Sequence, residues 1–225
     1  MDMRSRLVDE MMELASRAHK RVLKEGREAF LRLDDFGDDD AEVEPLDEEE
    51  EFDWADRWMH GILFDLPAGR DGEVVAEAYL RRMAAKLTDE ERGWLEEMLK
   101  APLTPFEVSE VRPGAGFAVK SLWDGQERFL TEPAASEDLS VGDVLALRVT
   151  RSGDVEGVEG GSYTFPEGAR TVIEAEMKKY LEANEAEAVD DLDPAARRLF
   201  SVVLHTVWCE LALEEPESSP PEELS

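Results

Sequence analysis

The chain contains few side chains that could perform acid–base, nucleophilic or metal chemistry. Its three histidines are His19, His60 and His205, and no two of them lie within 40 residues of each other. None belongs to a His-x-x-x-His or His-Glu-x-x-His frame, the spacing that places two zinc ligands on one helical face. The single cysteine, Cys209, excludes both an intrachain disulfide and a cysteine-rich metal site.

Two of these residues could still act together, because His205 and Cys209 are four apart and would meet across one helical turn. No neighbouring residue would favour the reactive thiolate, so we interpret Cys209 as a small buried hydrophobic residue. His60 could act as a general base near Asp65, but a helical histidine beside aromatic residues is usually structural. We therefore predict no catalytic residue, no cofactor and no metal site. An enzyme with a cryptic site stays as an alternative.

The net charge of -30 comes from 55 acidic and 25 basic residues among 225, and it is unevenly distributed. Residues 34–53 contain 13 acids and no base, and residues 210–225 contain six acids and no base. Blocks of like charge repel each other and offer few apolar groups to offset the entropy of ordering. We therefore predict an acidic linker over 34–53 and an acidic tail over 215–225.

Charge and hydropathy also exclude classes of function. No run approaches the ~18 apolar residues of a membrane span, and the first residues lack the apolar stretch of a signal peptide. Affinity for nucleic acid comes from Lys and Arg that replace counterions, and no basic stripe follows residue 33. We expect a cytoplasmic protein that contacts neither membranes nor free nucleic acid.

Residues 1–33 are predicted to form one long amphipathic helix. Leu7, Met11 and Leu14 belong to an apolar stripe with helical spacing, and Gly26 is the segment's weak point. The stripe is narrow and must dock on something: the body of the same chain, a second copy that would give a homodimer, or another protein. Leu7, Met11 and Leu14 are accordingly candidate partner-binding residues.

The rest of the chain predicts an α+β fold with four further regions. Residues 54–104 are helical, with a capping box at Thr88–Glu91. Over 105–166 the period changes to two, which indicates a small antiparallel β-barrel or bent sheet of four to five strands, with a hairpin turn at Asp124-Gly125. Residues 167–214 form C-terminal helices, the last of which begins at Asp193-Pro194.

Trp123 is the fourth candidate partner-binding residue. It stands just before the Asp124-Gly125 turn, where a core aromatic residue would be awkward. An exposed tryptophan among polar groups is a residue type that dominates binding energy at interfaces. The alternative is that Trp123 covers a neighbouring helix.

The stretch from about residue 58 to 170 resembles the central region of uncharacterised bacterial proteins that often carry a SEC-C-type zinc-binding motif. The shared features are a Phe-Asp-x-Pro step at 64–67, a Phe-Glu-Val start at 106–108, the Asp-Gly hairpin and a Val-Gly-Asp turn at 141–143. The resemblance implies a bacterial scaffold of helices and hairpins. The zinc cluster has no counterpart here, since Cys209 is the only cysteine, and no activity carries over.

These observations predict a non-enzymatic interaction factor: an inhibitor, chaperone or adaptor of a protein partner. The acidic charge favours a partner with a basic surface, which the charge would steer towards the chain at low ionic strength. A second hypothesis is an acidic mimic of nucleic acid, which requires carboxylates in rows on a rigid surface.

Overall fold

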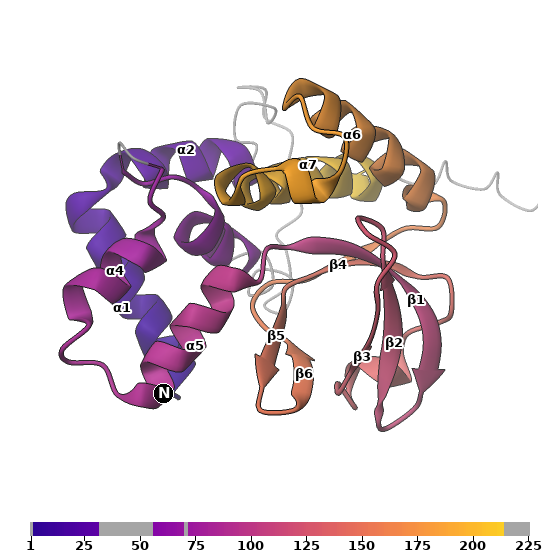
Figure 1. The fold of residues 1–225 in the computed structure, drawn as a ribbon, viewed down its shortest axis with the longest axis horizontal. Coiled ribbons are helices and arrows are strands. Elements are labelled where there is room, and N and C mark those ends of the chain that lie inside the picture. The colour runs from indigo at the N-terminus through magenta and orange to yellow at the C-terminus, as the bar shows by residue number, and fades with distance from the viewer. Residues whose placement is uncertain (1, 32–55, 70–71, 214–225) are drawn as a thin grey trace, which may run out of the picture.

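The computed structural model describes residues 2–31, 56–69 and 72–213 (Figure 1). The predicted acidic linker (34–53) and acidic tail (215–225) both lie outside these ranges. Within the described ranges the chain folds into helices α1 (Met3–Ala18), α2 (Lys20–Leu31), η1 (Gly61–Asp65), α4 (Val75–Met83), α5 (Asp89–Lys100), η2 (Ala135–Glu137), α6 (Ala169–Ala183), η3 (Val189–Asp191) and α7 (Pro194–Leu213), and strands β1 (Thr104–Arg112), β2 (Gly116–Ser121), β3 (Glu127–Leu130), β4 (Val144–Leu147), β5 (Val149–Ser152), β6 (Val155–Val158) and β7 (Tyr163–Phe165).

The predicted α+β class is confirmed, and the β part is an open sheet. Five antiparallel strands are arranged in the order β3-β2-β1-β4-β7, and β5 and β6 form a separate ribbon. The ribbon adjoins the sheet edge, since the Thr131 N–H donates to the Glu156 carbonyl at 3.0 Å. The sheet does not close into the barrel that we considered, because β7 at the other edge meets α7 instead of a strand: the Trp208 Nε1–H donates to the Thr164 carbonyl at 3.0 Å.

Three apolar clusters hold the molecule together. The first joins α1, α2, η1, α4 and α5. In the second, one side of the sheet, with Ala146 and Phe165, packs on Ile173 of α6 and Phe200 of α7. The third fills the other side of the sheet towards the β5–β6 ribbon. Figure 1 shows α7 beneath α6, with one end beside α2 of the helical half and the other above the sheet.

The predicted N-terminal helix is present, but it is divided at His19 into α1 and α2. There the backbone leaves helical geometry, with φ -129° and ψ 42°, and the His19 N–H donates to the Ala15 carbonyl at 2.9 Å. Both halves contact η1, but their other partners differ: α1 packs on α4 and α5, whereas α2 packs on α7. One straight helix could not reach both sets of neighbours, so tertiary packing decides the break.

Three local predictions are confirmed, one of them in part. The Thr88 hydroxyl accepts from the Glu91 N–H at 3.2 Å and the Glu91 carboxylate accepts from the Thr88 N–H at 2.6 Å, which is the predicted capping box. The Asp193 carboxylate accepts from the Ala196 N–H at 2.8 Å and caps α7. The hairpin at Asp124-Gly125 exists, but only Gly125 has a positive φ, of 71°. The turn is therefore not the two-residue type, in which both central residues have a positive φ.

No described helix combines the length and the apolar character that crossing a membrane requires.

We predict that acid weakens the contact between α1 and α4. The Tyr79 hydroxyl donates to the Glu10 carboxylate, and together with Arg6 this lowers the pKa of Glu10 below its ordinary 4.5. A lowered pKa gives stability that is present above pH 4.5 and is lost as pH falls through the folded-state value. Urea unfolding between about pH 6 and about pH 3 will show a smaller pH dependence for Glu10→Gln than for the wild type.

Glu13→Gln is the matched control, because Glu13 also lies on α1 but its side chain is 57% exposed. It should retain the wild-type pH dependence. A Glu10→Gln protein that loses stability with acid as steeply as the wild type would contradict this assignment.

Candidate functional site

The four candidate partner-binding residues lie in two places: three belong to the helical core and one lines a surface pocket. Leu7 and Met11 are fully buried in the helical core, and Leu14 is partly buried against the same core. The apolar stripe of α1 therefore packs within the chain, which is one of the alternatives that the sequence left open. Trp123 is partly exposed and lines a surface pocket.

The predicted pair of His205 and Cys209 forms, but in the interior. The Cys209 Sγ lies 3.4 Å from His205 Nε2, and the Tyr163 hydroxyl lies 3.2 Å from His205 Nδ1. Both His205 and Cys209 are only 1% exposed. The cluster is buried among aromatic rings, including Phe30 at 5.2 Å from the His205 ring centre, so a substrate could not reach it in this conformation.

His60 is also inside the protein, and its carboxylate partner is not Asp65. Its Nδ1 lies 3.1 Å from the Asp56 carboxylate and 2.8 Å from the Asp56 carbonyl oxygen. The cavity that His60 and Asp65 border has a volume of about 10 Å³, which is the space of one water molecule. Among the described residues, no three His, Cys, Asp or Glu side chains are placed to hold a metal ion.

Asp65 instead forms a buried ion pair that joins the helical half to the sheet. The Arg148 Nη2 donates to both Asp65 oxygens, at 2.9 and 2.8 Å, and the Arg148 guanidinium also donates to the Ala101 carbonyl. Burial raises the pKa of the Asp65 carboxyl, and the Arg148 charge opposes that rise. The sequence analysis missed this pair, since its members are 83 residues apart and no local pattern connects them.

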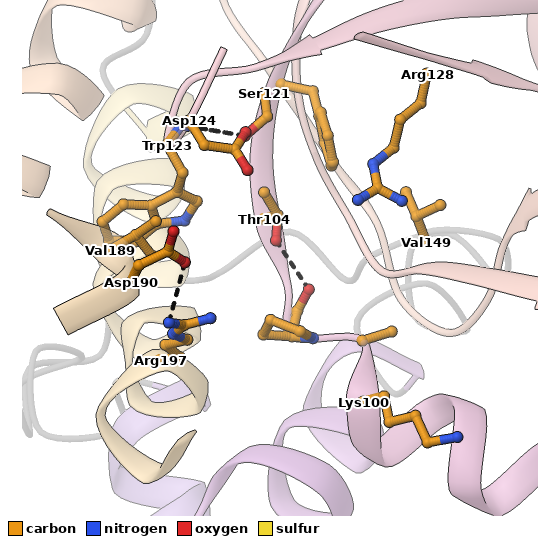
Figure 2. A pocket seen from close by; sticks show the side chains of 13 residues that line it. Lys100, Thr104, Ser121, Trp123, Asp124, Arg128, Val149, Val189, Asp190 and Arg197 are labelled. Carbon is orange, nitrogen blue, oxygen red and sulfur yellow. Dashed lines mark hydrogen bonds and ion pairs between the residues drawn. The ribbon is translucent and has the colours of Figure 1, made fainter. Parts of the chain in front are cut away.

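The pocket at Trp123 lies where α5, the sheet and the start of α7 meet (Figure 2). It has a volume of about 240 Å³. We call it the Trp123 pocket, and it is lined by Lys100, Ala101, Pro102, Thr104, Phe106, Ser121, Trp123, Asp124, Arg128, Val149, Val189, Asp190 and Arg197.

Trp123 is held rigidly in the wall of this pocket. The buried Ser121 hydroxyl accepts from the backbone N–H groups of Trp123 and Asp124, at 3.2 and 3.4 Å. The Trp123 ring packs on Phe200 of α7, with ring centres 4.5 Å apart at 63°. Its indole nitrogen faces the cavity in Figure 2. The side chain therefore both covers a helix and lines the pocket, which combines the two roles that the sequence left open.

The pocket is the basic end of a longer groove. A middle hollow of about 350 Å³ shares Lys100, Ala101, Arg128 and Val149 with it. A wider cleft of about 520 Å³ shares Glu97, Thr150 and Arg151 with that hollow. We call these three spaces together the α5–β5 groove, because they follow the seam between helix α5 and strand β5.

Charge changes sign along the α5–β5 groove. The Trp123 pocket is lined by three bases and two acids, although acids exceed bases twofold in the chain. The wide cleft is lined by four acids, Glu90, Glu96, Glu97 and Glu159, and by two bases, Arg4 and Arg151. We call this end the acidic cleft. An elongated ligand with charge at both ends would match this polarity.

No protein-family model, curated protein or solved structure matches the chain. The resemblance to SEC-C-associated bacterial proteins therefore stays a prediction.

Proposed function

We propose that the chain is a non-enzymatic protein-interaction factor that binds an extended segment of a partner protein in the α5–β5 groove. The observation that carries the proposal is the continuity of the three hollows, which share lining residues from Trp123 to the acidic cleft. A continuous surface groove with a rigid aromatic residue at one end suits a peptide segment. The most acidic end, together with the net charge of -30, favours a partner with basic residues.

The alternative of an enzyme with a cryptic site has less support. Its candidate residues, His60, His205 and Cys209, are 8% exposed or less, and they do not line the groove. Most of the surplus acid that a nucleic-acid mimic would need falls in residues 34–53 and 210–225, nearly all outside the described ranges. The described residues therefore contribute little support for that hypothesis.

We expect Trp123→Ala to weaken binding of the natural partner by about 30-fold, the effect of removing a central aromatic residue worth about 2 kcal/mol. The partner is first captured from the native host and identified by mass spectrometry. Both proteins are then purified and the dissociation constant is measured by calorimetric titration. Truncating the chain before residue 54 is not a suitable test, because it removes Leu7, Met11 and Phe30 from the core.

Two further variants make the test specific. Trp123→Phe keeps an aromatic ring against Phe200 and guards against loss of folding. Val141→Ala is the matched control, since Val141 is 67% exposed and lies outside the groove. A purified partner that binds Trp123→Ala as tightly as it binds the wild type would refute the proposal, as would the absence of any partner.

A further inference from the structure

We infer that the Trp123 pocket receives the C-terminal carboxylate of the partner segment, next to an apolar last residue. The inference rests on the proposed function and adds a direction to the bound segment. The carboxylate would lie at the basic end of the groove, and basic residues further from the terminus would lie over the acidic cleft.

The bases of the pocket keep hydrogen-bond donors for such a carboxylate. Arg128 and Arg151 both donate to the same Glu156 oxygen, at 3.1 and 2.8 Å, so two guanidinium charges share one carboxylate. Arg197 donates to Asp190 through Nη2 at 3.2 Å, and its side chain is 34% exposed, so part of its guanidinium can reach a ligand. A guanidinium has five N–H donors in a fork that fits a carboxylate.

The acids of the pocket are engaged by the chain itself. Asp190 accepts from Arg197, and Asp124 accepts from the backbone N–H of Gln126 at 3.0 Å. Lys100, at the end of α5, adds a third positive charge, paired with Glu97 at 2.9 Å. An incoming carboxylate therefore meets basic side chains whose positive charges are partly neutralised. The acids of the pocket do not outnumber these bases.

The pocket also offers apolar contacts to a single large side chain. Its walls include the Trp123 ring, Phe106 and Val149, and the Trp123 indole nitrogen faces the cavity (Figure 2). A volume of about 240 Å³ is smaller than typical sites for drug-sized ligands. It suits one terminal residue better than a chain that passes through.

The acidic cleft supplies the complementary end. Glu90 and Glu96 of α5 line it and form no ion pair with a described residue, whereas Glu159 is already engaged by Arg4 at 2.6 Å and by the Trp94 indole at 3.3 Å. Two carboxylates that form no ion pair in the described part of the chain favour Lys or Arg side chains of the bound segment.

Three synthetic peptides test the inference on the full-length protein. The first is acetyl-Lys-Ala-Lys-Ala-Phe with a free carboxylate, and the second is the same peptide as a C-terminal amide. The third, acetyl-Lys-Ala-Lys-Asp-Phe-amide, has a side-chain carboxylate only. Binding is followed by the NMR signal of the Trp123 indole N–H, assigned with Trp123→Phe. We expect the free acid to bind about tenfold more tightly than either amide, as expected for hydrogen bonds to a charged group.

Charge variants then locate the carboxylate. Arg197→Gln and Arg128→Gln should each lower the affinity for the free acid by about tenfold and leave the affinity for its amide unchanged. Arg81→Gln is the matched control, because Arg81 is an exposed arginine that pairs with Glu73 at 2.9 Å outside the groove. It should change neither affinity.

The outcomes separate this inference from the proposed function. Equal affinity for the free acid and its amide, or no shift of the Trp123 signal with any peptide, overturns the inference. Tight binding of the third peptide overturns the assignment to a chain terminus, because a side-chain carboxylate would then suffice. In each of these cases the proposed function still stands if the natural partner loses affinity for Trp123→Ala.

Discussion

Asp65→Ala is expected to lower the free energy of unfolding by about 3–5 kcal/mol, the usual cost of removing one partner from a buried ion pair. The side chains of Asp65 and Arg148 are 2% and 3% exposed, so the substitution leaves a guanidinium charge in the interior without its counter-charge. That guanidinium also holds the Ala101 carbonyl at the end of α5. Loss of the pair should therefore loosen the junction between the helical half and the sheet.

Two comparison proteins show whether the effect comes from the unpaired charge. Asp65→Leu combined with Arg148→Met removes both charges, and it should recover most of the lost stability because a hydrophobic replacement avoids the desolvation cost. Glu110→Ala breaks an exposed pair with Arg112 and should change stability little, because solvent screens an exposed pair. Urea unfolding monitored by circular dichroism measures all three. An Asp65→Ala protein as stable as Glu110→Ala would show that the buried pair contributes little.

Features of the fold that depend on neighbouring residues were predictable from the sequence. The capping box at Thr88 and the cap at Asp193 need only a hydroxyl or carboxylate three residues from a free backbone N–H. The change of hydrophobic period after Phe106 likewise indicated strands, because alternation reflects a sheet with unlike faces.

Features set by distant residues were not predictable. The apolar period continues through His19, so nothing local marks the break that separates α1 from α2. In the turn at Asp124-Gly125 the Ser121 hydroxyl accepts from two backbone N–H groups of the loop, an interaction that the dipeptide alone does not reveal.

Only one residue of the candidate site, Trp123, was predicted from the sequence. Trp123 stood out by its type and its place before a turn, but its pocket also contains Lys100 and Arg197, which lie almost 100 residues apart in the chain. The sequence marks such residues only as charges among many others. Charge polarity along the α5–β5 groove appears only when five separate segments of the chain come together.

The second large expected effect is on the free energy of unfolding when glycines are replaced by alanine. The substitution should lower this free energy at two helical sites and raise it at a third. Gly26 of α2 packs against η1, and Gly61 of η1 packs against α2. A Cβ on Gly26 would lie 2.3 Å from Ile62 Cγ1, and a Cβ on Gly61 would lie 2.3 Å from the Phe30 ring. Because Ile62 and Phe30 are buried, Gly26→Ala and Gly61→Ala should each lower the free energy of unfolding by about 1–3 kcal/mol.

Gly93→Ala is the matched substitution, since Gly93 also lies within a helix but a Cβ there would have nothing within 4 Å. It should raise the free energy of unfolding by about 0.5–1 kcal/mol, the helical advantage of alanine over glycine. The same urea experiment measures all three variants. If Gly26→Ala stabilised the protein as Gly93→Ala does, the sequence-based view of Gly26 as a mere weak point in a helix would be correct, and the close packing of α2 on η1 would be wrong.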